Sequence, residues 1–333
     1  MVIRIARSTP LLWRGPADVQ LGSSAKAIKL QSLSEAEQRL LRLLQLGIHE
    51  PDFARVSADI GVEPRASRSI LEAVRPSLEQ GHPDAHEAEL SREFVESAIA
   101  EIARANLKHH IDGVEVLRRR SQSQVFVETL DRVGLMLARA LAAAGVGSLV
   151  STDTQRVAIT DVAADGYPSR ARFASRAEAA EMIVSQGFSP TKTRLVKPHP
   201  AVLGKSRVAV LVGYGSLPPE RHQSWLRMGV AHLSVVFDDQ GVRVSPLIRP
   251  GGRPCLLCLD HERTDEDVAW PLLAAQLTTT SPEFADTVSR WFGVARASQR
   301  IIEYIDGFDG AMPVETGGHP RCSCALGAGG DAG

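Results

Sequence analysis

The sequence predicts an α/β domain over residues 114–325, with a mostly parallel sheet, preceded by a small winged helix-turn-helix-like domain over residues 1–80. Short strand-like runs and three short helical segments fill the first region, whereas from Val114 onward strand-like and helical stretches alternate. Such alternation is typical of a parallel sheet with helices on its faces. We expect residues 81–113 to connect the two domains and the glycine-rich residues 326–333 to form a flexible tail.

The first domain begins with the strand-like runs "VIRIA", "PLLW", "DVQL" and "AIKL", which are separated by glycine and proline. A capping box then marks a helix, because Ser34 precedes Glu37 by three positions, and Gly47 follows the apolar positions of that helix. The runs "DFARVSADIG" and "EPRASRSILEAVRPSL" predict two further short helices, the second beginning near Pro64. Small strands beside three helices favour the winged helix.

The second domain is expected to hold strands at "VEVLRRR", "QVFVETL", "SLVST" and "RVAVLVGYG", with helices over residues 132–144 and 176–185. The run "PPERHQSWLRMG" predicts a helix. The run "HLSVVFDDQGVRVSPLI" predicts a hairpin around Gly241, which would add an antiparallel strand. Two helices are expected near the end, at "DVAWPLLAAQL" and over residues 284–304.

Charge and hydropathy exclude several classes of protein. The chain has 38 basic and 39 acidic residues, so it lacks the basic excess expected when nucleic acid is the main partner. No stretch approaches the roughly 18 uninterrupted apolar residues of a membrane span. The N-terminal "MVIRIARSTPLLWRGP" carries scattered charges and no apolar core of a signal peptide. We therefore expect a cytoplasmic protein with no membrane partner.

All four cysteines fall in two tight pairs, Cys255-x-x-Cys258 and Cys322-x-Cys324. In a cytoplasmic chain, two such pairs are typical of a structural zinc ion held by four thiolates with no open position. Buried thiols without a metal, or a redox-active C-x-x-C pair, are the alternatives. If zinc takes every sulfur, no free thiol is left for nucleophilic catalysis.

A degenerate nucleotide-binding loop follows the strand "QVFVETL". Gly134 stands at the third position of G-x-G-x-x-G, but Thr129 and Asp131 replace the first and second glycines. We predict that Asp131 caps the following helix and so satisfies the amides that a phosphate would use. Asp153, 19 residues after Gly134, stands where an acid could hold ribose hydroxyls or could simply form a turn.

The stretches "VFVETLDRVGLMLARALAAAGVGSLVSTD" and "VRVSPLIRPGGRPCLLCL", with the closing "RCSC", resemble the E1-like ThiF/MoeB/UBA superfamily. The segments "PLLWRGPADVQLG" and "LSEAEQRLLRLL" are similar to ThiF-like proteins that bind precursor peptides beside YcaO-type cyclodehydratases. The resemblance implies an E1-like, Rossmann-type fold, a peptide recognition element at the N-terminus, a YcaO-type partner enzyme and a homodimer.

By the same resemblance, the strand "DVQLG" and residues 66–74 would form the groove for a precursor peptide, taken as an added strand. Leu21, Ile70 and Val74 are its candidate contacts, and core packing is the alternative for each. Active E1-like enzymes would use the glycine loop, an Arg, a Lys and a magnesium-binding Asp to adenylate a carboxylate. After "RVAVLVGYG" no carboxylate stands where that Asp belongs, so ATP and magnesium are not expected to bind.

The sequence thus predicts a degenerate E1-like protein that binds a precursor peptide or small protein and presents it to a partner enzyme. An active ATP-dependent adenylyltransferase with a divergent loop is the alternative. A nicotinamide oxidoreductase would need the same missing glycines. A DNA-binding winged helix is a further alternative, but glutamates accompany its arginines, and the whole chain carries no positive excess. These residues are Arg65, Arg68, Arg75, Glu63, Glu72 and Glu79.

Overall fold

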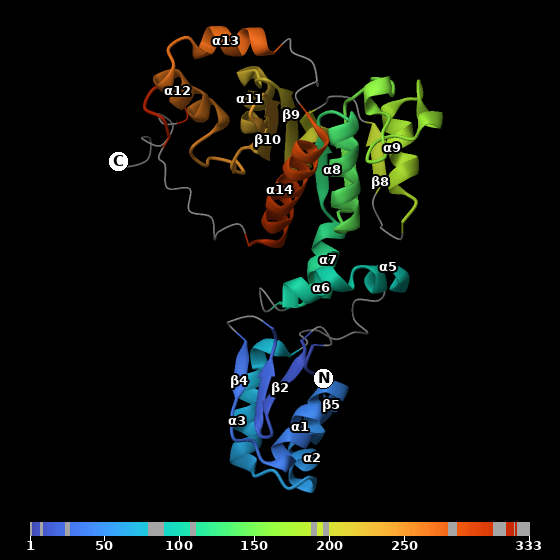
Figure 1. Ribbon diagram of the computed structural model, residues 1–333, viewed down its shortest axis with the longest axis vertical. Coiled ribbons are helices and arrows are strands. Elements are labelled where there is room, and N and C mark those ends of the chain that lie inside the picture. The colour runs from blue at the N-terminus through green and yellow to red at the C-terminus, as the bar shows by residue number, and fades with distance from the viewer. Residues whose placement is uncertain are drawn as a thin grey trace. The chain divides into compact units, whose positions relative to one another are not determined.

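The computed structural model describes residues 2–6, 9–23, 27–78, 90–106, 111–187, 192–195, 200–278, 285–308, 318–322 and 324 (Figure 1). The chain divides into two compact units, Met1–Arg118 and Arg119–Gly333. The predicted tail at residues 326–333 lies outside the described residues, as does most of the first half of the predicted connector. No helix among the described residues is both long enough and apolar enough to span a membrane.

The first unit contains two small antiparallel sheets and a group of helices. Strands β2 (Leu11–Gly15), β3 (Asp18–Leu21) and β4 (Ile28–Leu30) form one sheet in that order, and β1 (Val2–Ile3) pairs with β5 (Ile48–His49). The helices are α1, α2, α3, α5 and α6, and α7 begins in this unit. Their bounds are Glu35–Leu46, Phe53–Asp59, Pro64–Val74, Arg92–Ser97, Ile99–Arg104 and Gly113–Ser121.

Local signals in the sequence account for several of these elements. Ser34 and Glu37 form the predicted capping box, and Gly47 ends α1 at a φ of 100°. Pro64 stands at the first position of α3, where its fixed φ favours a helix start. The strand expected at "VEVLRRR" is wrong, because this segment is α7, whose first amides are capped by Asp112 at 2.9 Å from the Val114 nitrogen. The winged-helix assignment of this unit remains a prediction.

The second unit is built on a six-stranded sheet in the order β11-β10-β9-β6-β7-β8. Every pairing is parallel except that of β10 with β11, which form the predicted hairpin around Gly241. The strands are Gln124–Val127 (β6), Ser148–Ser151 (β7), Lys192–Leu195 (β8), Val208–Tyr214 (β9), Ala231–Asp238 (β10) and Gly241–Val244 (β11).

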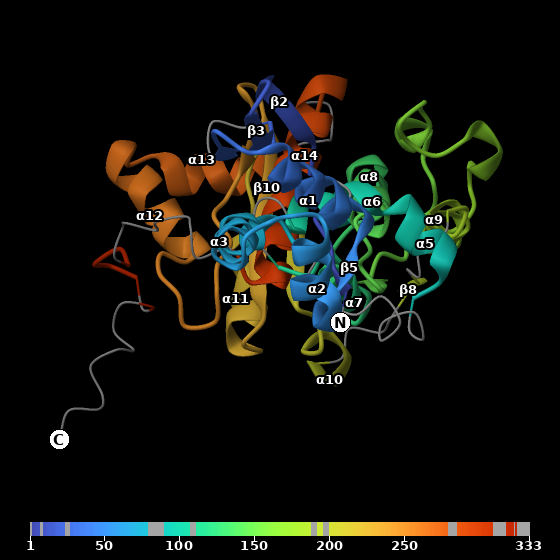
Figure 2. The same cartoon turned by 90° about the horizontal axis from the view of Figure 1, so that it is seen from below.

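Helices cover both faces of this sheet (Figures 1 and 2). One face packs against α8 (Arg132–Ala143), α9 (Arg176–Val184) and α14 (Thr287–Asp306), and their side chains form the largest apolar core. The other face packs against α11 (Pro219–Arg227) and α12 (Leu256–Glu266), followed by α13 (Trp270–Leu277), and a short helix α10 (Pro200–Leu203) precedes β9. The chain reverses its strand order between β6 and β9, and such switch points are where open parallel sheets bind ligands.

Candidate functional site

The loop between β6 and α8 lies at the carboxyl end of β6, at the switch point of the sheet. Asp131 is the N-cap of α8, as predicted, because its Oδ1 accepts a hydrogen bond from the Gly134 nitrogen at 3.0 Å. Its Oδ2 accepts one from the Tyr214 hydroxyl at 2.6 Å. Only 8% of Asp131 is exposed. The carboxylate therefore stands buried against the helix amides that a nucleotide phosphate would use.

Two further aspartates accept hydrogen bonds from other amides of this loop. The Asp153 carboxylate accepts a hydrogen bond from the backbone amide of Leu130 at 2.7 Å. The Asp161 carboxylate accepts one from the backbone amide of Arg132 at 3.2 Å. Both carboxylates are buried. Three backbone donors at the start of α8 are thus each satisfied by a carboxylate of the same chain, which is how a buried loop avoids unpaired polar groups.

Both carboxylate oxygens of Asp153 accept hydrogen bonds from the chain itself, and the residue is buried. Besides the loop amide, its Oδ2 accepts from the Thr129 hydroxyl at 3.3 Å, and its Oδ1 accepts from the Gln155 nitrogen at 2.8 Å. The structure therefore brings Thr129, Asp131, Gly134 and Asp153 together, as the sequence predicts. It arranges them as a closed hydrogen-bonded cluster.

Arg176 supplies the positive charge that the buried carboxylates need. Its guanidinium pairs with Asp161 at 2.8 Å and with Asp153 at 3.2 Å, and only 14% of its side chain is exposed. Tyr167 donates to the Leu130 carbonyl at 2.6 Å and is completely buried. Sequence reasoning assigned no role to Asp161, Tyr167 or Arg176, because their partners lie 15 to 37 positions away in the chain.

Burial gives Asp131 an unusual titration. Desolvation raises the pKa of the Asp131 carboxyl, although hydrogen bonds from Tyr214 and Gly134 favour the charged form. A raised carboxyl pKa means that the folded protein loses stability as pH rises through the unfolded pKa and up to the folded one. Burial and Asp131 together raise the pKa of Tyr214, so its hydroxyl keeps the proton that it donates.

Replacing Asp131 with asparagine is expected to stabilise the protein at pH 7. The Oδ1 cap of Gly134 is kept while the buried charge is removed, so we expect a melting temperature a few degrees higher, the effect of about 1 kcal/mol in a unit of this size. The difference should shrink as the pH falls toward 4, where the parent carboxyl takes up its proton. Thermal melts at both pH values test this, and a variant less stable at pH 7 would show that Arg176 depends on the Asp131 charge.

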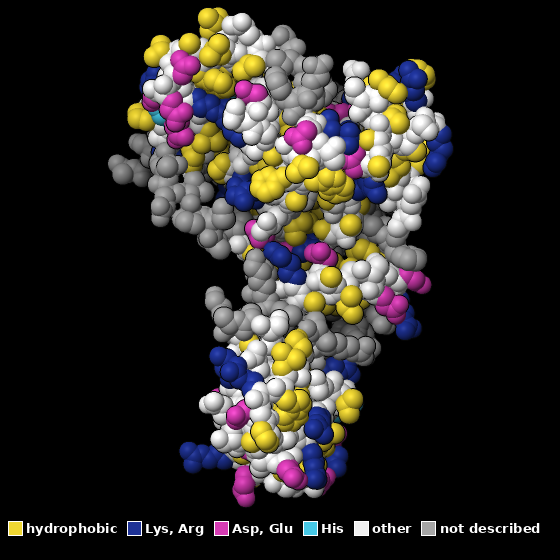
Figure 3. Space-filling model, viewed as in Figure 1, with side chains coloured by type: hydrophobic (Ala, Val, Ile, Leu, Met, Phe, Trp, Pro, Cys, Tyr) yellow, Lys and Arg dark blue, Asp and Glu magenta, His cyan; other side chains and the backbone are white. Residues whose placement is uncertain are grey.

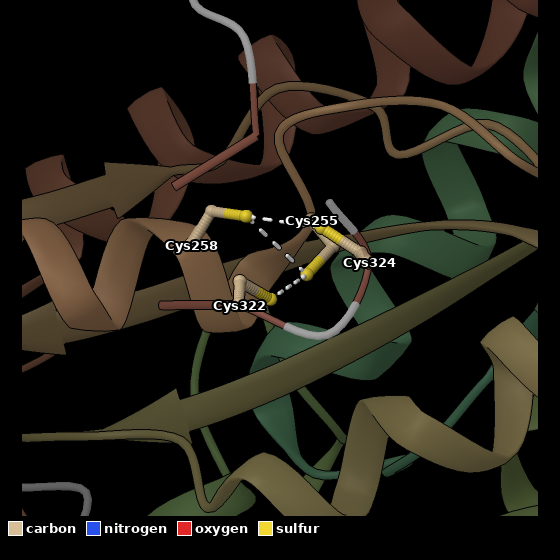
Figure 4. A group of neighbouring side chains, drawn as sticks. All are labelled: Cys255, Cys258, Cys322 and Cys324. Atoms are coloured by element: carbon tan, nitrogen blue, oxygen red, sulfur yellow. Dashed lines mark hydrogen bonds between the residues drawn. The ribbon is translucent and has the colours of Figure 1, made fainter. Parts of the chain in front are cut away.

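The four cysteines form a second candidate site, on the α12 face of the sheet. Their sulfurs all lie within 4.8 Å of one another, and the side chains point toward a common centre (Figure 4). The Cys255–Cys258, Cys255–Cys322 and Cys258–Cys324 sulfurs are 3.8, 3.6 and 3.2 Å apart. Sulfurs around a tetrahedral zinc at about 2.3 Å would be about 3.8 Å apart. The donor set and spacing therefore suit a metal ion such as zinc.

The surroundings of the cluster support the same use. The backbone amide of His319 donates a hydrogen bond to the Cys258 sulfur at 3.3 Å, a contact of the kind that stabilises a thiolate. The Nε2 atom of His319 is hydrogen-bonded to Oδ2 of Asp265 at 2.8 Å, and this contact holds the imidazole outside the sulfur cluster. Without metal, burial raises the pKa of Cys255 to about 11, so binding must displace a proton and weakens as the pH falls.

The proposed peptide contacts in the first unit are buried. Leu21 is 2% exposed, Ile70 5% and Val74 0%, and all three pack in one apolar core. Their burial favours the alternative weighed from the sequence, which is core packing. The strand "DVQLG" also cannot accept an added strand, because β3 pairs with β2 on one side and with β4 on the other. A peptide strand would have to join β2 or β4.

No protein-family model matches this sequence, and no curated protein matches it. Solved structures match it over nearly its whole length. The microcin C7 biosynthetic enzyme MccB in complex with N-formylated MccA gives a TM-score of 0.68 at 11% identity, covering 98% of this chain and 100% of that one. E. coli MccB with ATP gives 0.66 at 11% identity, covering 97% and 99%. PaaA gives 0.67 at 15% identity, covering 91% of each chain.

These likenesses show that this chain shares the fold of MccB and PaaA. Membership of the E1-like, ThiF-type superfamily stays a prediction. At 11–15% identity they do not carry an activity over to this chain. The association with a YcaO-type enzyme and the homodimer remain predictions.

Proposed function

We propose that this protein binds a precursor peptide or small protein through its first unit and presents it to a partner enzyme, without adenylating it. The observation that carries the proposal is the occupation of the α8 N-terminus by Asp131, Asp153 and Asp161. E1-like adenylation needs that N-terminus open for the phosphates of ATP. Here a triphosphate would meet three carboxylates where it needs donors and positive potential.

Binding of a polypeptide is supported by both the neighbours and the first unit. MccB has been solved with SeMet MccA, and a selenomethionine-containing ligand is a polypeptide. In the first unit, β2 and β4 are the edges of a three-stranded sheet. On β2, Leu12 and Trp13 are 42% and 43% exposed, and Arg42 lies over the Trp13 ring at 5.4 Å. An exposed edge with apolar side chains suits a peptide added as a strand.

Direct contact with nucleic acid is not supported by the charge distribution. Basic and acidic side chains are interspersed on the face drawn in Figure 3. Arg55, for example, pairs with Asp52 at 3.0 Å and with Asp59 at 3.4 Å. We infer that the partners are a peptide and a protein, the latter of the YcaO type, and that the protein acts as a homodimer.

Titration of ATP and Mg²⁺ into the purified, metal-loaded protein tests the proposal. We expect no heat of binding up to about 1 mM ATP, where a dissociation constant of that size would correspond to about −4 kcal/mol. We also expect no ATP–pyrophosphate exchange with any added peptide. E. coli MccB, which has been solved with ATP, serves as the positive control. Micromolar binding to this chain would overturn the proposal and establish the alternative, an active adenylyltransferase.

The single substitution Asp131→Gly is expected not to restore nucleotide binding. It would free the Gly134 nitrogen, but Asp153 and Asp161 would still occupy the Leu130 and Arg132 nitrogens. The same calorimetric titration measures this, with circular dichroism to show that the variant is folded. Micromolar affinity in Asp131→Gly would mean that one carboxylate alone keeps ATP out, and that the other two move aside.

Peptide binding is tested separately, with a fluorescently labelled candidate precursor encoded beside this gene. We expect Trp13→Ala to weaken binding about tenfold or more if the peptide joins β2, since aromatic side chains dominate such contacts. Leu46, 74% exposed on α1, provides the control Leu46→Ala, which should leave binding unchanged. Equal affinities for the parent and Trp13→Ala would indicate that the peptide pairs with β4, the other edge strand, and not with β2.

A further inference from the structure

A cavity of about 460 Å³ lies on the α12 face of the sheet, away from the loop that precedes α8. Its walls come from α11, from the β10–β11 hairpin and from α12, all within the second unit. Of these elements, α11 and α12 pack on the same face of the sheet (Figure 2). The volume is in the range of small-molecule sites, and much of the lining is apolar. The apolar lining residues are Leu217, Pro219, Val236, Val244, Leu256 and Leu259.

The cavity wall contains two arginines, Arg243 and Arg263. Arg263 forms no ion pair with any residue that the structure describes, and burial and the nearby Arg243 lower its pKa. Its guanidinium stacks on the Trp270 ring at 5.0 Å, and the Trp270 indole donates to Asp260 at 2.7 Å. Arg263 is thereby held in place, and Asp260, Asp238 and Glu266 act on its charge without forming a direct ion pair. Arg243, the other arginine of the wall, already pairs with Asp238.

The remaining polar groups limit the charge of a guest. Asp260, Glu262 and Glu266 line the same cavity and would repel a di- or triphosphate. His222 adds no positive charge, because burial lowers its pKa to about 4. Ser234, 7% exposed in the wall, has a hydroxyl with no hydrogen bond to a described residue. The cavity thus combines apolar walls and the Ser234 hydroxyl with Arg263, which has no direct ion pair, and with carboxylates that restrict the charge of a guest.

We propose that this cavity binds a monocarboxylate with an apolar body, whose carboxylate pairs with Arg263. A fork of guanidinium donors fits a carboxylate in two parallel hydrogen bonds, and the apolar part of the guest fills the space beside Leu256 and Leu259. A free small acid and the carboxylate end of a peptide share this chemistry. The proposal is independent of nucleotide binding, since the cavity and the loop before α8 lie on opposite faces of the sheet.

Calorimetric titration of N-acetyl-leucine, against N-acetyl-leucinamide, tests this pairing in the metal-loaded protein. We expect the acid to bind with a dissociation constant below about 1 mM and the amide at least about tenfold more weakly. Arg263→Gln should abolish the preference for the acid, and Ser234→Leu should weaken both probes by filling the cavity. Arg227→Gln, which removes an exposed arginine of α11 outside the cavity, should change neither.

A second pair of probes, acetyl-Ala-Ala-Leu and its amide, distinguishes the two sources of the carboxylate. Tighter binding of this acid than of N-acetyl-leucine assigns the cavity to a peptide end, and weaker binding assigns it to a free acid. Equal binding of acids and amides, an unchanged preference in folded Arg263→Gln, or no binding at about 10 mM would overturn the proposal.

Discussion

Replacing Cys255 with serine is expected to abolish zinc binding and to destabilise the second unit severely. Cys255 is 1% exposed, and its sulfur lies 3.8 Å from that of Cys258 and 3.6 Å from that of Cys322. Structural zinc in small domains contributes about 10–16 kcal/mol, as much as the whole stability of a typical domain, about 5–15 kcal/mol. We expect metal analysis to find one ion per chain in the parent and almost none in the variant, whose thermal transition should broaden or disappear.

The matched control for this substitution is His261→Gln. The His261 ring lies 5.1 Å from the His319 ring, beside the cluster, but four sulfurs already complete a tetrahedral site. We expect this variant to keep its metal and its melting temperature within a few degrees. If Cys255→Ser also keeps full metal and melts like the parent, the cysteines are not the ligands. If His261→Gln loses the metal, the site includes this imidazole.

Signals confined to a few neighbouring residues could be read from the sequence. The Ser34–Glu37 capping box and the Asp131 cap of Gly134 each join residues three positions apart, so spacing alone predicted them. The four cysteines were predicted because C-x-x-C and C-x-C are local patterns, even though the two pairs lie more than 60 positions apart. The hairpin around Gly241 follows from the same kind of local turn chemistry.

Contacts between distant segments could not be predicted in the same way. The segment "VEVLRRR" has β-branched residues that favour a strand, but the structure makes it helical. Within it, Arg120 forms a buried pair with Asp306 at 2.7 Å, 186 positions away. Arg176 joins Asp153 and Asp161 in the loop cluster for a similar reason: its role depends on where α9 packs. Tertiary packing decides such positions.

Gly134→Ala is expected to destabilise the protein by about 3 kcal/mol or more, whether or not any nucleotide binds. A Cβ at this position would lie 1.7 Å from the Thr129 carbonyl oxygen and 2.6 Å from its carbonyl carbon. Both are backbone atoms of the loop before α8, so no side chain can rotate to relieve the clash. The surviving glycine of the motif is therefore required by the close approach of helix and loop.

Gly229→Ala is the control that separates this clash from the general cost of replacing a glycine. Gly229 has a φ of +65° and open space around its Cα, so alanine there should cost only about 1–2 kcal/mol of backbone strain. Chemical denaturation of both variants measures the difference.

Equal destabilisation of the two variants would mean that the Thr129 carbonyl shifts easily to make room for the new Cβ. A loop that yields in this way could also release Leu130 and Arg132 from Asp153 and Asp161, which would leave room for a phosphate. A much larger loss in Gly134→Ala would show that the loop is rigid. A rigid loop closed by its own carboxylates is what the proposed non-adenylating function requires.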